Sequence, residues 1–302
     1  KYTGVKGSIE AGETTYGDDR NWTTTLTGGT PFASGRGHAL FNAQYSQRDG
    51  VYGNGSREWT QQGWHLINNP AYAVGNGAPE YITSPNSGRA DMTPGGIITA
   101  GPLRGTYFGA DGAVNQFAYG PTANNWTVGG DWRLGVSSDR TSLEPEARRG
   151  GLFTRMSYEL TNNLETFVQV SWNQVRARQW AGTHSDKGGI TIQADNAFIP
   201  ESVRQQLEDE GLTSFTMGSH NADIPTRESD NTRTVQRYVV GLEGRFDAFN
   251  HDWRWDAYYQ KGITRAHEEL YTYNTARLRE AQDAVFDGDG NIVCRSGNPD
   301  CV

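Results

Sequence analysis

The chain has 302 residues and a formal net charge of −8, and its mean hydropathy is −0.72. The negative charge argues against a nucleic-acid surface, which carries a basic stripe, and no run of about 18 apolar residues exists to form a transmembrane helix. Low hydropathy is typical of soluble proteins but does not exclude a transmembrane β-barrel, in which only every second residue of each strand need be apolar.

Three segments of alternating apolar and polar residues open the chain, and each is predicted to be a strand. They cover residues 3–15, 21–30 and 38–49. Turn-forming residues at 17–19 and 31–37 separate them.

A long excursion follows at residues 51–143, rich in Gly, Pro, Asn, Trp and Tyr and without a sustained period. Loops longer than about 15 residues are uncommon in compact domains. We therefore expect this segment either to carry function or to hold small hairpins of its own.

A central hairpin comes next, with predicted strands at residues 150–160 and 164–179 and a tight reversal between them. In each arm the apolar residues alternate with polar ones and fall on one face. Each arm has about ten residues or more, the length a tilted strand needs to cross a bilayer. Common soluble strands have only about five or six.

Two further strands are predicted at residues 232–246 and 253–270, and they lie between a second excursion at 181–231 and a third at 273–302. The third excursion is expected to open with a short helical stretch.

One helix is predicted inside the second excursion. Pro200 suits its first turn, Val203 and Leu207 lie four residues apart on one face, and Gly211 can end it.

The connections reveal the architecture, because successive connections of an antiparallel meander lie at alternate ends of the sheet. The three excursions share one end, and the turns near Pro31, Asn162 and Asn250 share the other. Short turns at one end and long loops at the other are typical of outer-membrane barrels. The predicted fold is therefore all-β, an antiparallel transmembrane β-barrel that is incomplete in this chain, with about seven long strands and long extracellular loops.

Aromatic residues cluster beside the short turns, where an aromatic girdle at the membrane surface is expected. They are Tyr158, Phe246, Phe249, Trp253 and Trp255.

Three stretches resemble the barrel portion of TonB-dependent outer-membrane receptors. They are Gly-Arg-Gly-His-Ala-Leu-Phe-Asn-Ala-Gln-Tyr-Ser-Gln-Arg-Asp-Gly at 35–50, Asp-Asn-Ala-Phe-Ile-Pro at 195–200 and Ser-Asp-Asn-Thr-Arg at 229–233. The resemblance implies a 22-stranded barrel closed by a plug domain, located in the bacterial outer membrane and importing a scarce nutrient with energy relayed by TonB. It also implies the partners: outer-membrane lipid and lipopolysaccharide, the plug domain of the same full-length chain, TonB, and an extracellular small-molecule or oligosaccharide ligand.

The sequence departs from that family pattern in three respects. A plug domain, a TonB-contacting TonB box and a closing C-terminal strand are all missing. Lys1 is not a start and the chain stops in mid-loop after Cys301. We therefore expect residues 1–302 to be the N-terminal part of the barrel domain of a longer protein.

No catalytic residue, metal site or cofactor is predicted, and the chain is not expected to be an enzyme. The run 267–271 begins like a zinc-protease helix but lacks the second histidine. The run 287–291 mimics the start of a calcium loop, but Ile292 stands where the sharp-turn glycine belongs. A hairpin turn at Asp289-Gly290 explains that run better.

The first excursion carries many aromatic side chains that are expected to be exposed, together with arginines, and such a set can stack on sugar rings or grip an iron chelate. The alternative is that each aromatic packs the loop on itself or on its neighbours. The aromatics are Tyr52, Trp59, Trp64, Tyr72, Tyr81, Tyr107, Phe108, Phe117, Tyr119, Trp126 and Trp132. The residues predicted to bind ligand are Trp59, Trp64, Tyr107, Phe108, Trp126, Trp132, Arg57 and Arg104.

The two cysteines, Cys294 and Cys301, are predicted to form a disulfide at the tip of the third excursion. Free thiols or half of a metal site are the alternatives, although this segment offers no His as a metal partner. Gly297, Asn298 and Pro299 between them are turn formers that can bring the two chain directions together, and the cell surface is an oxidising environment.

Two functional classes follow from these features. The first is a receptor for TonB-energised uptake of a scarce nutrient, such as a siderophore or an oligosaccharide. The alternative is a passive porin or a carbohydrate-binding or adhesive β-protein.

Overall fold

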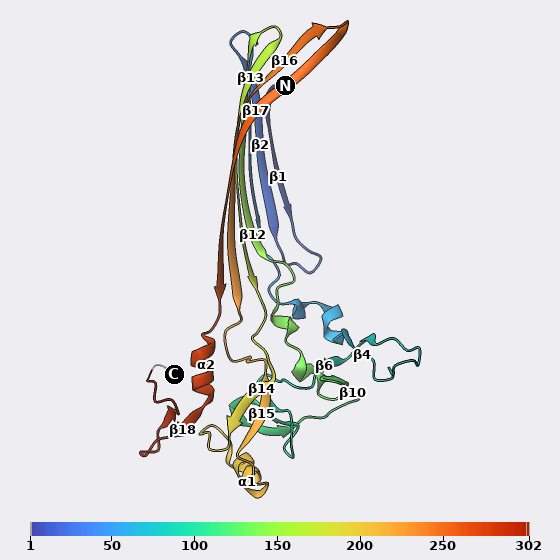
Figure 1. Ribbon diagram of the computed structural model, residues 1–302, viewed down its shortest axis with the longest axis vertical. Helices are drawn as coiled ribbons and strands as arrows, with labels where there is room; N and C mark the ends of the chain where they lie inside the picture. The colour runs from blue at the N-terminus through green and yellow to red at the C-terminus, as the bar shows by residue number, and fades with distance from the viewer. Residues whose placement is uncertain (1, 300, 302) are drawn as a thin grey trace. The chain divides into compact units, whose positions relative to one another are not determined.

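The computed structural model (Figure 1) describes residues 2–299 and 301. The chain forms two compact units, here called the sheet unit and the loop unit. The sheet unit comprises Lys1–Tyr52, Ser142–Gln179 and Ser229–Leu270, and the loop unit comprises Gly53–Thr141, Trp180–Glu228 and Tyr271–Val302.

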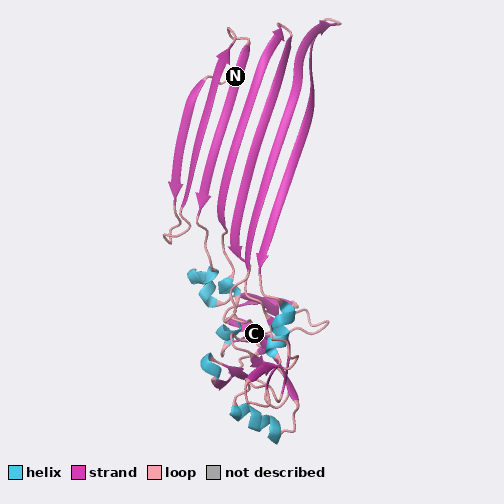
Figure 2. Cartoon of the chain, turned by 90° about the vertical axis from the view of Figure 1, so that its left-hand side faces the viewer, coloured by secondary structure: helices cyan, strands magenta, loops and turns pink. Residues whose placement is uncertain are grey.

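The sheet unit is a single sheet of seven long strands in the order β1-β2-β3-β12-β13-β16-β17, and Figure 2 shows them side by side. Strands that are neighbours in the sheet are also consecutive among the long strands of the chain. The sheet is therefore a meander, as predicted. The strands are β1 (Gly4–Gly12), β2 (Asn21–Phe32), β3 (Gly37–Arg48), β12 (Glu146–Thr161), β13 (Leu164–Trp180), β16 (Glu228–Ala248) and β17 (His251–Tyr271).

All seven strands lie within four residues of their predicted bounds, and the largest differences are at the ends next to the excursions. There β12 begins at Glu146 rather than at 150, and β16 begins at Glu228 rather than at 232. Most of these added residues are polar and break the apolar alternation, but they still join the neighbouring strand. Glu146 and Ala147 lie opposite Arg178 and Ala177, and the Asp230 carboxylate accepts a 2.9 Å hydrogen bond from Nε of Arg176 on β13.

The register places the apolar residues of successive strands opposite one another. Leu152 pairs with both Trp172 and Ala43, and Ala43 pairs with Leu26. Residues that face each other in an antiparallel pair share one face of the sheet. The face built in this way is called the apolar face below.

The apolar face continues across the last two strands. A Cβ on Gly241 would meet the ring of Phe167, which lies on the other face opposite Ser157. The even-numbered side chains of β16 therefore lie on the apolar face, and the stacked rings of Phe246 and Trp253 carry that face into β17. The apolar face contains Val5, Ile9, Trp22, Leu26, Phe41, Ala43, Tyr45, Leu152, Met156, Val168, Trp172, Tyr238, Val240, Leu242, Phe246, Trp253 and Trp255.

The loop unit shows that the excursions hold small sheets of their own. One sheet has five strands in the order β14-β15-β7-β8-β9, one has three in the order β10-β11-β6, and β4-β5 and β18-β19 are hairpins. The strands are β4 (His65–Asn68), β5 (Tyr81–Ser84), β6 (Ser87–Arg89), β7 (Ile97–Ile98), β8 (Thr106–Phe108), β9 (Val114–Gln116), β10 (Thr122–Ala123), β11 (Trp126–Val128), β14 (Asp186–Gln193), β15 (Ser214–Ser219), β18 (Ala284–Phe286) and β19 (Ile292–Cys294).

Two α-helices and five short 3-10 helices complete the described part of the loop unit. They are α1 (Glu201–Asp209), α2 (Thr275–Gln282), η1 (Asn54–Ser56), η2 (Glu58–Gln62), η3 (Ala110–Gly112), η4 (Trp132–Gly135) and η5 (Ser138–Arg140). Neither α-helix is long and apolar enough to cross a membrane.

Helix α1 is the helix predicted in the second excursion, and it supplies part of the core of the loop unit. Its Val203 and Leu207 are fully buried, and Gly211 follows it with a left-handed φ of 62°. Val203 and Leu207 pack with the strand residues Ile98, Ile190, Ile192 and Phe215 and with Leu103 and Ile199.

The predicted disulfide is present: Cys294 and Cys301 are bonded, with 6.5 Å between their Cα atoms. The predicted hairpin turn is present as well. The Asp287 carboxylate accepts hydrogen bonds from the backbone N–H groups of Asp289 and Asn291, which explains the acidic run without a metal.

Candidate membrane interface and ligand-binding residues

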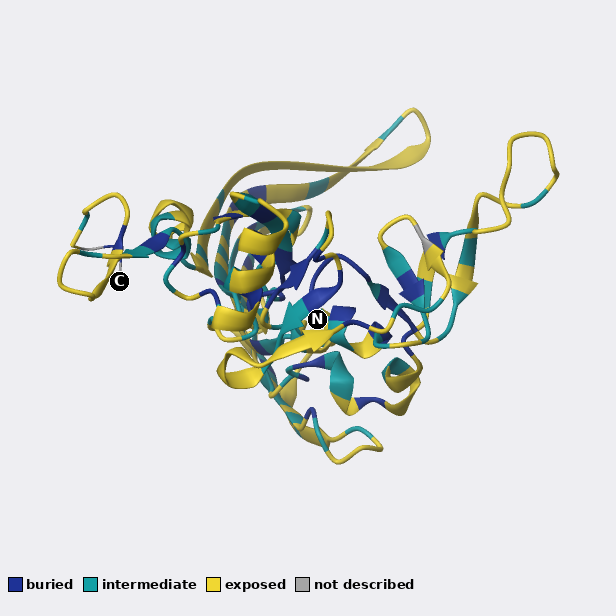
Figure 3. Cartoon of the chain, turned by 90° about the horizontal axis from the view of Figure 1, so that it is seen from below, coloured by how far each residue is buried: buried dark blue, intermediate teal, exposed yellow. Residues whose placement is uncertain are grey.

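The apolar face of the sheet unit is exposed along its whole width. Val5 is 74% exposed, Leu152 57%, Val168 50% and Val240 49%, and Figure 3 shows exposed residues along the long strands. Soluble monomers rarely expose contiguous apolar patches larger than a few hundred Å². Within the described residues of the sheet unit this face has no second sheet packed on it, unlike the inner face of a β-sandwich.

The apolar residues form a band with a limited height. In β16 the even-numbered residues are apolar from Tyr238 to Phe246, except for Gly244, whereas the even-numbered residues from Asp230 to Gln236 are polar. Nine strand residues span about 30 Å, which a tilt of about 35–45° reduces to about 21–25 Å. That height matches the apolar band of about 25 Å on the outside of a membrane barrel.

A row of aromatic residues borders the band beside the short turns, where it was predicted. Phe32 stacks on Tyr158 with 6.2 Å between ring centroids, and Phe246 stacks on Trp253 at 6.4 Å. The ring of Trp255 lies over Gly244. The guanidinium of Arg36 lies 5.1 Å from the ring centre of Tyr158.

A second aromatic row, which was not predicted from the sequence, borders the band on the side of the excursions. The ring centroids of Trp22 and Tyr45 lie 5.3 Å apart, and Trp172 lies beside Gly150. Tyr238 lies two residues before Val240 in β16, so both side chains are on the same face of the sheet. The signal was present in the sequence, because each residue continues the apolar alternation of its own strand.

The opposite face of the sheet is polar and charged. Arg155 donates to Glu243 at 2.7 Å and lies 4.0 Å from the ring centre of Phe167. Arg237 donates to the side-chain oxygen of Gln260 at 2.9 Å. Arg155, Arg237 and Glu243 line a groove of about 500 Å³. These charged side chains make this face much more polar than the apolar face.

The eight predicted ligand-binding residues divide into three local groups in the loop unit. Arg57 and Trp59 lie at η2, and Trp132 packs near them against Gly63. Trp64 follows Gly63 and belongs to the same group, with its indole N–H donating to the side-chain oxygen of Gln62 at 2.9 Å. Trp126 lies between His65 and the guanidinium of Arg89, at 5.0 and 5.6 Å. The third group lies at β8 and contains Arg104, Tyr107 and Phe108, with Arg104 stacked 4.7 Å from the ring centre of Tyr119.

The expectation that these side chains are exposed is wrong for three of the residues named above. Trp132 is 8% exposed because it fills the space above Gly63, which has no side chain. Phe117 is 2% exposed because Tyr107 and Tyr119 pack on it at 6.3 and 4.8 Å. Arg57 is 5% exposed. Of the eight predicted ligand residues, Trp59, Trp64 and Arg104 are exposed.

Burial also changes the chemistry of Tyr119, which the sequence analysis did not single out as a site. Its hydroxyl is buried without a hydrogen-bond partner. Burial raises the pKa of Tyr119, and the nearby Arg104 opposes that rise.

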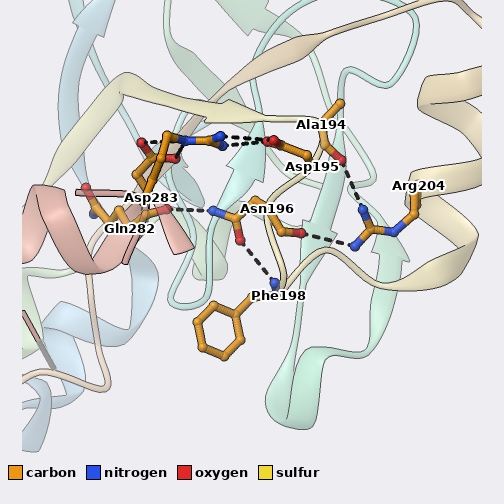
Figure 4. A network of polar contacts seen from close by, with 8 residues as sticks. Ala194, Asp195, Asn196, Phe198, Arg204, Gln282 and Asp283 are labelled. Atoms are coloured by element: carbon orange, nitrogen blue, oxygen red, sulfur yellow. Dashed lines mark hydrogen bonds and ion pairs between the residues drawn. The ribbon is translucent and has the colours of Figure 1, made fainter. Parts of the chain in front are cut away.

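Residues in the 195–200 motif of the second excursion form polar contacts with the third excursion (Figure 4). Arg295 forms ion pairs with Asp195 at 2.5 Å and with Asp283 at 3.0 Å. The amide of Asn196 donates to the backbone oxygen of Gln282 at 2.7 Å. The Arg295 guanidinium holds the pKa of the Asp195 carboxyl below its usual range.

Among the described residues, no group of three or more His, Cys, Asp or Glu side chains could hold a metal ion. Comparison with known proteins returns no family model, no curated protein and no solved structure that matches this chain.

Proposed function

We propose that the sheet unit is part of the wall of a β-barrel in the bacterial outer membrane. The observation that carries this proposal is the exposed apolar band, bordered by an aromatic row on each side, on one face of a sheet of long strands. In this proposal the band contacts lipid and lipopolysaccharide, and the polar face lines the lumen.

The connections support the same orientation. Beyond the short β1–β2 connection, the loops at one end of the sheet are the excursions, whereas Ala33–Arg36, Asn162–Asn163 and Phe249–Asn250 are short turns at the other. The short turns would face the periplasm and the excursions the outside of the cell. The disulfide in the third excursion is consistent with an oxidising exterior.

The edges of the sheet determine what else the barrel needs. Strands β1 and β17 are the two edges, so no described strand pairs with their outer sides. Backbone groups inside a bilayer must be paired. The proposed barrel therefore requires further strands beside β1 and β17.

We further propose that the protein is a receptor for TonB-energised uptake of a scarce nutrient, with the loop unit contacting the nutrient. The support is the resemblance of residues 35–50, 195–200 and 229–233 to TonB-dependent receptors, together with the exposed Trp59 and Trp64. A passive porin is the competing function, because a porin has the same membrane wall.

The two functions differ in their need for energy. Cells that express the full-length protein would be tested for uptake of radiolabelled siderophores and oligosaccharides, with and without TonB. We expect uptake of one compound to require TonB and to fall when Trp59 and Trp64 are changed together to Ala. Uptake that is equal without TonB would contradict the receptor and identify a porin.

A further inference from the structure

The hairpin of β4 and β5 presents an apolar surface to solvent. Ile67 is 1% exposed and lies opposite the half-buried Ile82, so one face of the hairpin packs on the loop unit. On the other face, Leu66 is 64% exposed and Tyr81 51%. Trp64 precedes Leu66 by two residues, which places it on the same face, and it is 55% exposed.

The loop that joins these strands is held in one conformation by two asparagine side chains. The amide of Asn69 donates to the backbone oxygen of Pro79 at 2.8 Å, and that of Asn76 donates to the oxygen of Ala71 at 2.7 Å. The side-chain oxygens accept from backbone N–H groups of the same loop at 3.0 Å. Val74 at its tip is 93% exposed. A surface that is ordered before binding loses less entropy when a partner binds.

Charged side chains are almost missing from this segment. Residues 59–88 contain Glu80 and no other Asp, Glu, Lys or Arg. The whole chain is 21% charged, so thirty residues would be expected to hold about six. Depletion of charge and enrichment in Trp and Tyr distinguish the centre of a protein interface from the rest of a surface.

We propose that the hairpin surface, made of Trp64, Leu66, Tyr72, Val74 and Tyr81, contacts the same surface on a second copy of the chain. In a two-fold contact, residues near the axis face their own copies, so any charge there meets a like charge. A neutral apolar surface avoids this repulsion. The pairing would also cover a two-stranded sheet, which is marginally stable alone.

Two other occupants fit the surface less well. An oligosaccharide could stack on Trp64 and Tyr81, but it gains little from the exposed aliphatic side chains of Leu66 and Val74. An anionic membrane attracts basic segments, and this segment has none. The five side chains are few beside the roughly 20–30 residues that each partner contributes to a standard interface. We therefore expect a weak dimer that forms as concentration rises.

The test measures self-association of the full-length protein in detergent by sedimentation velocity, from low to high micromolar concentration. The wild type should form dimers. Leu66→Glu and Leu66→Lys alone should each weaken association at least about tenfold, because each places like charges across the two-fold axis. An equimolar mixture of the two variants should dimerise again, since Glu then faces Lys.

Phe198→Glu is the matched control, because Phe198 is 68% exposed and its side chain points away from the neighbouring polar network (Figure 4). This variant should dimerise like the wild type. The dimer and the uptake function share Trp64, but the Leu66 variants leave Trp64 in place. The dimer can therefore fail this test without affecting the uptake prediction.

Three results would overturn the proposal: a wild type that stays monomeric, a dimer that Leu66→Glu leaves intact, or a mixture of the charged variants that stays monomeric. If the monomer instead shows a blue shift of tryptophan fluorescence with phosphatidylcholine vesicles, lost in Leu66→Glu, the surface binds lipid. If maltooligosaccharides protect Trp64 from oxidation, it binds sugar.

Discussion

At the scale of single residues, the apolar face predicts where a charge is costly. Val168 lies on that face between the two aromatic rows, and Ser171 lies on the polar face of the same strand. Val168→Arg should destabilise the full-length protein in lipid vesicles by roughly 2–4 kcal/mol, because the bilayer midplane does not solvate the charge. Ser171→Arg should cost much less. Urea unfolding in vesicles measures both, and equal costs would contradict the assignment of the faces.

The sequence was a good guide to residues in regular strands and a poor one to residues in the excursions. Alternation alone placed Leu152, Val168 and Val240 on one face, because a strand has a period of two. The burial of Trp132 and Phe117 could not be predicted in this way. Trp132 packs on Gly63, which is distant in the sequence. Phe117 packs on Tyr107 and Tyr119, but the segment has no period that indicates which of its aromatic residues is buried.

At the scale of elements, the contacts of Arg295 should keep hairpin β18–β19 ordered. Arg295→Gln removes its ion pairs with Asp195 and Asp283, so the amides of Ala284 and Cys294 should exchange hydrogen several times faster. Arg279→Gln is the control, because Arg279 is exposed on α2. Exchange that is equally fast in both variants would contradict a role for these ion pairs. The effect should be modest, since the partners are partly exposed and solvent screens them.

The same contacts should make the stability of hairpin β18–β19 depend on pH. The pKa of Asp195 is lowered in the folded protein by Arg295, so Asp195 contributes stability at neutral pH. That contribution is lost as the pH falls through the lowered pKa. The protection factors of the β18–β19 amides, which correct for the change of intrinsic exchange with pH, should therefore fall in strong acid in the wild type, and less so in Arg295→Gln.

The sequence predicted long elements better than short ones. The seven long strands and helix α1 have nine residues or more, which is enough for a period to be read. The pairing of β6 with β11 joins three residues on each strand, and that of β7 with β15 joins two. The paired strands are far apart in the sequence, so no local pattern predicts the pairing. The added ends of β12 and β16 were missed because their polar side chains break the alternation.

At the scale of the whole molecule, one sheet with an apolar and a polar face accounts for the long strands, the aromatic rows and the placement of the excursions. The meander and its register explain why the apolar residues of seven strands share one face. A shift by one residue in any strand would move its apolar side chains to the polar side.

Spin-label accessibility along β13 tests the central claim most directly. Single cysteines at 168, 169, 170, 171 and 172 of the full-length protein in vesicles would carry the label, since the native cysteines are bonded to each other. We expect labels at 168, 170 and 172 to be reached by oxygen, which concentrates in lipid, and those at 169 and 171 by a water-soluble nickel chelate. Labels that are reached by the nickel chelate at every position, or the reverse alternation, would contradict a lipid-facing apolar face.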